Sequence, residues 1–161
     1  MFTYQGKLVI VSLELPCGRK IASINDLLAS SVWQQGHNGF PPQDPGFFDH
    51  VINKKADFVR VYLPPDANCL LSVFDHCLRS RHYVNVVVAG KHPLPQWLTM
   101  DEAVVHCTEG IRIWQWASND QCTEPDVVMA GCGDTPPRAL LVSVFLLIEH
   151  LTERHIKVLN L

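Results

Sequence analysis

The sequence predicts an α/β protein built on parallel strands. Two stretches, residues 57–89 and 126–159, each read as strand, helix and strand in that order. Parallel strands need a long crossover connection, usually a helix, so each stretch has the pattern of a βαβ unit. Segments rich in proline and glycine precede and separate the two stretches and favour turns. Together these features favour parallel sheets covered by helices over an all-α or all-β architecture.

The first stretch contains three expected elements. β-Branched and aromatic residues predict a strand over residues 57–63, which Pro64 and Pro65 end because proline cannot donate to a sheet ladder. Asp66 can then cap the helix that follows. The second strand is expected over residues 83–89. The residues expected on the apolar side of the helix are Leu70, Leu71, Val73, Phe74, Cys77 and Leu78.

The second stretch is preceded by a proline-rich connection over residues 92–98. Thr99 is followed by acidic residues, which are favoured in the first turn of a helix. Alternation over residues 111–116 predicts a short strand, and the polar segment 118–125 is the expected domain boundary. The elements expected beyond it are a strand over 126–130, a helix over 136–153 and a strand over 156–159.

Length, charge and cysteine usage limit the class of protein. The chain has 161 residues and a formal net charge of −3, with scattered basic residues, which argues against a nucleic-acid or polybasic membrane surface. The densest apolar run, residues 139–148, is too short to cross a bilayer and is expected to be a buried helix. No secretory leader is recognisable, and residues 7–15 have strand character. The six cysteines show no C-x-x-C pairing, so we expect reduced thiols and a cytoplasmic location.

The loop from His37 to Gly46 is the strongest functional candidate. Its three prolines and two glycines exclude a helix interior or a central strand. Four aromatic residues bracket it: Trp33, Phe40, Phe47 and Phe48. Polar groups on a rigid loop at the end of a sheet are typical of α/β binding sites, although ordinary turn chemistry also explains the composition.

Several motifs resemble the phosphoketolases, enzymes of the transketolase superfamily. In chain order they are HNGFxxQDPG at 37–46, NKK at 53–55, VRVYLPPDAN at 59–68, DHCLRSR at 75–81, YVNV at 83–86, AGK at 89–91 and EPDVVMA at 124–130. The resemblance runs from about Ile21 to the C-terminus, while residues 1–20 match nothing recognised. It implies part of a pyrimidine-binding-like domain over 21–95, a connecting segment over 96–125 and the first βαβ unit of a transketolase C-terminal-like domain over 126–161.

The resemblance also implies an activity. Phosphoketolases are aldehyde-lyases that cleave xylulose 5-phosphate or fructose 6-phosphate with inorganic phosphate, yielding acetyl phosphate and an aldose phosphate. It implies thiamine diphosphate and Mg²⁺ as cofactors, with most of their binding site missing from this chain. His37 matches a catalytic position, and Gln35, Asn38 and Lys91 match positions that bind the sugar phosphate or inorganic phosphate. His37 and Asn38 could instead lock the loop through backbone hydrogen bonds.

This chain departs from the family pattern at important positions. Pro42 stands where the family has a histidine implicated in catalysis, and a proline side chain cannot carry a proton. The acid that activates the cofactor and the domain that holds Mg²⁺ have no counterpart here. We therefore expect a fragment that is inactive unless another chain supplies the missing half-sites. The alternative is a non-catalytic interaction module, either a homodimer or a partner of a full-length relative, binding through apolar residues around Trp33, Phe40 and Trp97.

Two further chemistries are less well supported by the residue pattern. A metal hydrolase would have to use His37, Asp44, Asp49 and His50, whose spacing matches no recognised metal site, so no metal ligands are assigned. Gly131-Cys132-Gly133 follows a predicted strand but lacks the third glycine of a dinucleotide-binding loop.

Overall fold

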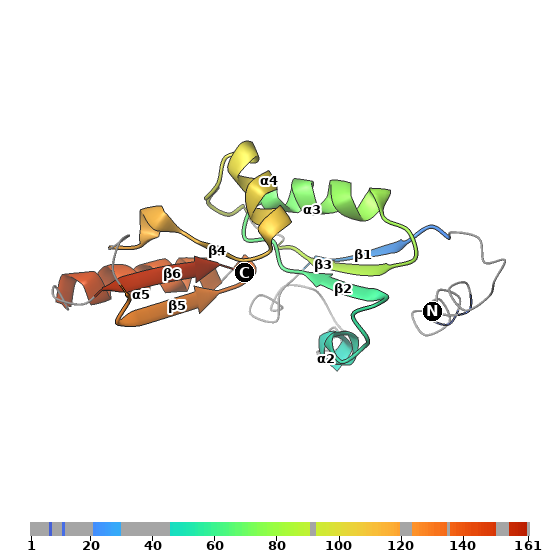
Figure 1. Ribbon diagram of the computed structural model, residues 1–161, viewed down its shortest axis with the longest axis horizontal. Coiled ribbons are helices and arrows are strands. Elements are labelled where there is room, and N and C mark those ends of the chain that lie inside the picture. Colours follow the sequence, from blue (N-terminus) through green and yellow to red (C-terminus); the bar gives the residue numbers. More distant parts are fainter. Residues whose placement is uncertain are drawn as a thin grey trace. The chain divides into compact units, whose positions relative to one another are not determined.

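The computed structural model describes residues 7, 11, 21–29, 46–90, 93–119, 124–134, 136–150 and 155–160. These residues form parallel-sheet α/β structure, as the sequence predicts (Figure 1). The chain divides into two compact units. The first comprises Met1–Tyr62 and Val73–Lys91, and the second comprises Leu63–Ser72 and His92–Leu161.

The first unit is built on a parallel sheet of β1 (Ile24–Leu28), β2 (Val59–Tyr62) and β3 (Val84–Val88), in the order β1-β3-β2. All five residues of the central strand β3 are buried, as expected for a valine-rich strand covered on both faces. Leu28 pairs with Val88, and Tyr62 pairs with Val87. The carboxyl ends of the three strands therefore meet at one edge of the sheet.

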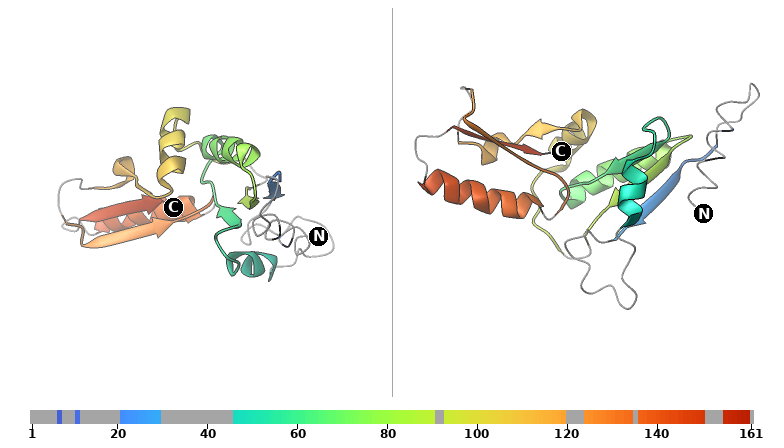
Figure 2. Two further views of the ribbon diagram at one scale, coloured as in Figure 1. Left: turned by 45° about the vertical axis from the view of Figure 1, so that its right-hand side comes forward. Right: turned by 90° about the horizontal axis from the view of Figure 1, so that it is seen from below.

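Helices cover both faces of this sheet (Figures 1 and 2). α2 (Gly46–Ile52) lies on one face, and α3 (Ala67–Arg79), of which residues 73–79 belong to this unit, lies on the other. The core under α2 is formed by Val51, Val59, Val84 and Val86. The predicted parallel crossover from β2 through α3 to β3 is confirmed.

A buried asparagine ties the sheet together. Asn85 of β3 is fully buried, and its Nδ2 donates to Asn25 Oδ1 at 2.7 Å and to Ser80 Oγ at 2.9 Å. Asn25 and Asn85 are also register partners on β1 and β3. Because a one-residue slip would turn Asn85 away from both acceptors, these bonds help to specify the register.

The second unit contains the sheet β4-β6-β5, formed by β4 (Arg112–Ile113), β5 (Val127–Gly131) and β6 (Ile156–Asn160). β5 and β6 are parallel and are connected through α5 (Pro136–His150), so the predicted second βαβ unit is confirmed. α5 covers one face of this sheet (Figure 2). The core is formed by Trp114, Val144, Ile156 and Val158.

α4 (Met100–Glu109) begins and ends with local signals that the sequence carries. The Thr99 side chain caps the helix and forms a reciprocal capping box with Glu102. Gly110 ends it in the left-handed conformation, with φ 78°, and its N–H donates to the His106 carbonyl. Only Gly adopts this conformation without strain, which explains its position after the last turn.

The predicted apolar side of α3 was wrong at two positions. Leu71 and Leu78 are 61% and 69% exposed, whereas Cys69, Val73 and Cys77 are buried. The buried residues recur every four positions and so form one stripe. Leu71 lies about 200° around the helix from Cys69, which places it outside that stripe.

Two other expected strands also differ from the structure. Within residues 111–116, only Arg112 and Ile113 are in a strand. The strand ends there because the next residue, Trp114, is buried in the core, and the 3₁₀ turn η2 (Gln115–Ala117) follows. The expected strand over 7–15 lies mostly outside the described residues. Its two described residues, Lys7 and Val11, are helical. The prediction rested on β propensity, which depends strongly on context.

The division into units also differs from the predicted boundary at 118–125. The described residues on both sides of that segment belong to the second unit. β4 lies before it in the chain and pairs antiparallel with β6 beyond it. This pairing joins residues on both sides of the polar segment in one sheet.

Candidate functional site

The residues assigned to substrate and phosphate lie outside the described residues. They are Gln35, His37, Asn38 and Lys91, together with Pro42 of the same loop and the aromatic residues Trp33 and Phe40. Their roles therefore stay predictions.

The structure does describe the strand ends that precede the loop and Lys91 in the chain. β1 ends at Leu28, shortly before the loop segment, and β3 ends at Val88, shortly before Lys91. Leu28 and Val88 are register partners, and the Ala89 N–H donates to the Leu28 carbonyl at 2.9 Å. Both segments thus follow neighbouring parallel strands at the same edge. Ligands of open α/β sheets bind at the carboxyl ends of the strands, so this geometry suits a shared site.

Asp66 follows β2 in the chain, and both oxygens of its carboxylate accept hydrogen bonds from backbone amides. Oδ1 accepts from Cys69 N at 2.8 Å, while Oδ2 accepts from Trp97 N at 3.1 Å and Leu98 N at 2.9 Å. The Asn68 amide adds a bond to the Leu98 carbonyl at 2.8 Å. With both oxygens bonded and only 6% of the residue exposed, Asp66 is a structural anchor and not a general base or metal ligand.

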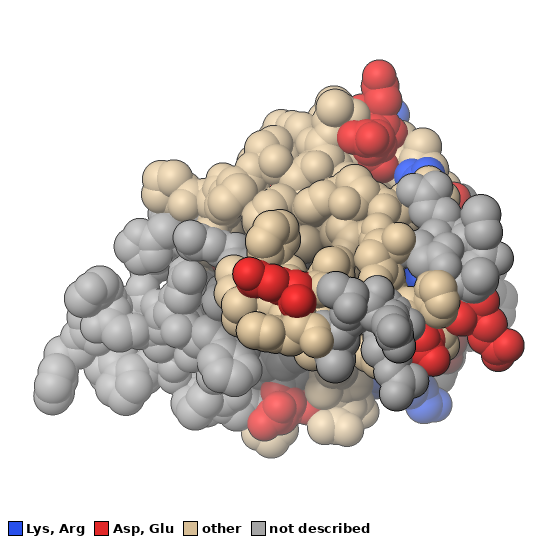
Figure 3. Space-filling model, turned by 90° about the vertical axis from the view of Figure 1, so that its left-hand side faces the viewer, with Lys and Arg blue, Asp and Glu red and all other residues tan. Residues whose placement is uncertain are grey.

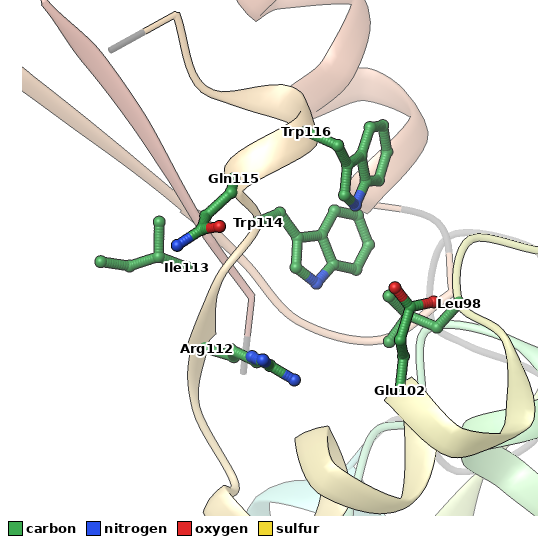
Figure 4. Close-up of a pocket in the computed structure, with 7 residues that line it drawn as sticks. All are labelled: Leu98, Glu102, Arg112, Ile113, Trp114, Gln115 and Trp116. Atoms are coloured by element: carbon green, nitrogen blue, oxygen red, sulfur yellow. The ribbon is translucent and has the colours of Figure 1, made fainter. Parts of the chain in front are cut away.

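A small hollow in the second unit is lined by side chains of several elements (Figure 4). Trp114 and Trp116 stack with ring centroids 5.1 Å apart on one side of it, and Glu102 and Arg112 reach toward it from α4 and β4. Its volume is about 110 Å³. Pockets for metabolites usually enclose about 300–1,000 Å³, so this hollow is too small for a sugar phosphate or thiamine diphosphate.

The charged groups beside this hollow have structural roles. Glu102 accepts from the Thr99 backbone N–H at 2.9 Å and from Thr99 Oγ1 at 2.8 Å. These two bonds, and to a smaller extent the nearby Arg112 guanidinium, lower the pKa of the Glu102 carboxyl. Arg112 also lies 3.7 Å from a Glu109 carboxylate oxygen, an exposed pair that contributes little. Glu102 therefore lacks the raised pKa expected of a catalytic acid.

His106 is the most deeply buried described histidine and also lacks a catalytic setting. It is only 3% exposed, and desolvation lowers the pKa of its imidazole. Asp49 and His50 of the metal hypothesis are exposed on α2. Within the described part of the chain, no group of three or more His, Cys, Asp or Glu side chains could hold a metal ion.

Sequence reasoning missed two features of the second unit. Trp97, Trp114 and Trp116 form one aromatic cluster, with ring centroids 5.1 to 6.2 Å apart. Cys69 and Cys107 meet although they lie 38 positions apart. The closely spaced Trp114 and Trp116 could have suggested the first feature, whereas nothing in the local sequence indicates the second. No described helix is long and apolar enough to span a membrane.

Comparison with known proteins identifies relatives over nearly the whole chain. Residues 1–80 match the family model described as D-xylulose 5-phosphate/D-fructose 6-phosphate phosphoketolase, and residues 91–161 match the model of the C-terminal domain of that family. The first match includes residues 1–20, where no resemblance was recognised from the sequence.

Named relatives agree with these matches. The chain is 65% identical over 160 residues to probable phosphoketolase 1 of Rhizobium meliloti, 64% identical to a probable phosphoketolase of Rhodopirellula baltica and 61% identical to one of Nitrosomonas europaea. Each alignment covers 99% of this chain but only 20% of the relative.

Proposed function

Because this chain belongs to the phosphoketolase family, we propose that it forms part of an enzyme that cleaves xylulose 5-phosphate or fructose 6-phosphate with inorganic phosphate. The products are acetyl phosphate and an aldose phosphate. The observation that carries this proposal is the ordered match to both family models, with 65% identity to a probable phosphoketolase across 99% of the chain. A cytoplasmic location is part of the proposal, in keeping with the free thiols of the described cysteines.

The proposed substrate contacts come from the loop and from the end of β3. Lys91 supplies a positive charge for phosphate oxygens, next to Gly90, which lets the ligand approach the backbone. His37 contacts the reacting part of the sugar phosphate, and Gln35 and Asn38 hold its hydroxyl or phosphate oxygens. The shared strand edge of β1 and β3 supports bringing these residues together.

The cofactors proposed for the enzyme are thiamine diphosphate and Mg²⁺. Thiamine diphosphate, when bound, supplies the electron sink for carbon–carbon cleavage. The described residues offer no carboxylate cluster suited to a metal diphosphate, so they do not fit this group.

We further propose that these 161 residues are inactive by themselves. They span 20% of the length of the relatives named above, and Pro42 cannot perform the proton transfer expected of a histidine at its position. Loss of one general acid–base group costs about 100-fold to 10,000-fold in rate.

The proposal is tested by measuring acetyl phosphate formation from fructose 6-phosphate, inorganic phosphate, thiamine diphosphate and Mg²⁺. The isolated chain is expected to give no turnover above a protein-free control, and robust turnover would refute its inactivity. A chimera carrying this chain in place of the matching segment of the Rhizobium meliloti relative tests the function itself. We expect weak activity in the chimera and an increase in that activity of at least 100-fold with Pro42→His. Adding Lys91→Ala is expected to abolish saturation of the rate by inorganic phosphate. A Pro42→His chimera without activity would refute the proposed function.

The second candidate function is an interaction module that associates with a full-length phosphoketolase. Val142, Phe145 and Leu146 of α5 are 61%, 75% and 50% exposed. Figure 3 views the molecule from the side of α5 and β5, and most described residues on that face are neither acidic nor basic. Exposed apolar side chains in such numbers favour a partner. The surface predicted from the sequence is a different one, around Trp33, Phe40 and Trp97. Trp33 and Phe40 lie outside the described residues, and Trp97 is only partly exposed and stacks on Trp116.

Co-purification with tagged full-length relative separates this candidate from the first. Phe145→Glu is expected to abolish co-purification, because it places a charge in the apolar surface. Ser143→Glu adds the same charge at an exposed position on the edge of that surface and is expected to have a much smaller effect. Equal binding by both variants and by the unmodified chain would exclude the α5 surface.

A further inference from the structure

Two cysteines of the second unit come together from different helices. Cys69, in the first turn of α3, is completely buried, and Cys107, in the last turn of α4, is partly exposed. They belong to one apolar cluster with Leu98 and Ala103. The Cys107 Sγ lies 3.7 Å from the Cys69 carbonyl oxygen, so the two residues are in direct contact.

The surroundings make the two thiols chemically unequal. The hydrogen bond from the Cys69 thiol, assisted by one from Ser72, lowers the pKa of the Cys107 thiol to about 7. The same contact, burial and the Asp66 carboxylate raise the pKa of the Cys69 thiol. A substantial fraction of the chains therefore carries a thiolate on Cys107 at neutral pH. The thiolate is the form of cysteine that reacts with oxidants, and here it is on the partly exposed residue of the pair.

We propose that Cys69 and Cys107 form a peroxide-sensitive dithiol that hydrogen peroxide converts into a disulfide between α3 and α4. The Cys107 thiolate first attacks one oxygen of hydrogen peroxide. The O–O bond breaks, Cys107 becomes a sulfenic acid and the second oxygen leaves as hydroxide, which takes up a proton to give water. The Cys69 sulfur then attacks the Cys107 sulfur, and the sulfenic oxygen leaves with the Cys69 proton as a second water. In sum, two thiols and one hydrogen peroxide give one disulfide and two waters.

Cys77 provides a matched control on the same helix. It is completely buried, as Cys69 is, but its hydrogen-bonding neighbour is the Tyr62 hydroxyl rather than a thiol. Burial raises the pKa of the Cys77 thiol, so it stays protonated at neutral pH. Cys77 has neither the partner nor the thiolate that the proposed reaction requires.

The test maps the crosslink in the purified chain. Reduced protein is treated with an equimolar amount of hydrogen peroxide, the remaining thiols are blocked with N-ethylmaleimide, and the sample is digested with trypsin without reduction. Cys69 and Cys77 share the tryptic peptide 61–79, while Cys107 is in the peptide 92–112. The mapping is therefore repeated in Cys77→Ser, where any link from peptide 61–79 must involve Cys69.

The expected product is a linked pair of peptides 61–79 and 92–112, equally abundant in the unmodified chain and in Cys77→Ser and removed by dithiothreitol. Cys69→Ser is expected to lose this product at least tenfold and to retain a Cys107 sulfenic acid that dimedone traps. If Cys69→Ser has lost its native circular dichroism, Cys69→Ala replaces it. The linked pair is also expected to fall at least threefold in guanidinium, because the native contact is absent there.

Two results would overturn the proposal. One is accumulation of a Cys107 sulfenic acid in the unmodified chain without the linked pair, since Cys69 would then be out of reach. The other is an undiminished linked pair in Cys69→Ser or in guanidinium, since the link would then not depend on the native contact.

Discussion

Replacing Asp66 by alanine should be among the most destabilising single changes in the second unit. It removes the acceptor of three backbone amides, those of Cys69, Trp97 and Leu98. Leaving a buried donor unsatisfied costs about 1–3 kcal/mol, and loss of a helix cap typically costs about 1 kcal/mol. Allowing for partial access of water to the freed amides, we expect a loss of about 3–5 kcal/mol in the free energy of unfolding. Whole domains are stable by about 5–15 kcal/mol, so the effect is large.

Urea unfolding followed by tryptophan fluorescence measures this loss. Trp97, Trp114 and Trp116 all belong to the unit that contains Asp66, so their emission reports on it. Asp66→Asn keeps the shape and at least one acceptor, and we expect it to lose about 1–3 kcal/mol. Asp101→Asn, an exposed carboxylate in the first turn of α4, is the control and should lose less than about 1 kcal/mol.

Hydrogen exchange gives an independent measurement of the same anchor. The amides of Trp97 and Leu98 should lose protection in Asp66→Ala before the rest of the unit does, because their acceptor has been removed. Two results together would refute this account of the carboxylate. The unfolding free energy of Asp66→Ala would lie within about 1 kcal/mol, a typical hydrogen-bond value, of that of the unmodified chain. The amides of Trp97 and Leu98 would also keep their protection.

Three further predictions each concern a single residue. Asn85→Ala removes the bridge between β1, β3 and the end of α3 and should cost about 2 kcal/mol in urea unfolding. Gly110→Ala meets no neighbouring atom but must adopt φ 78°, so it should cost about 1–2 kcal/mol by the same measurement. The folded state lowers the pKa of His106, so the unfolded chain binds the proton more readily. Stability should therefore fall as the pH drops through the ordinary histidine pKa. His106→Gln should flatten that part of the stability–pH curve.

Each of these has a control in the same chain. Asn53→Ala removes only an exposed bond to the Asp49 carbonyl and should cost less than about 1 kcal/mol. Gly110→Asn, which tolerates the left-handed conformation better, should recover part of the loss of Gly110→Ala. His50→Gln on the exposed surface of α2 should leave the pH dependence unchanged. An unchanged curve in His106→Gln would mean that burial of this ring does not perturb its protonation.

Much of the secondary structure was predictable because its signals are local. The capping box at Thr99 and Glu102 and the left-handed Gly110 define both ends of α4 within a few residues. The valine-rich run at 84–88 predicts a buried central strand, and the spacing of strand, helix and strand predicts parallel pairing.

Other features depend on which distant residues meet. Asp66 was expected only to cap α3, yet its second oxygen binds amides 31 and 32 positions away. The buried stripe of α3 is defined by Cys69, Val73 and Cys77, and periodicity alone did not separate it from Leu71. Residue patterns report local preference and amphipathic character, but they do not report which neighbour covers a given position.

The amino-acid sequence by itself therefore determined the α/β class, the order of the main elements and the family, because motif residues and short-range signals are written in consecutive positions. The tertiary structure alone decided that Leu28 and Val88 end side by side, that β4 joins β6 across the polar segment, and that Cys107 meets Cys69. These contacts form only when the chain path brings separated segments together, since the free energy that selects them comes from burial and hydrogen bonding across the fold.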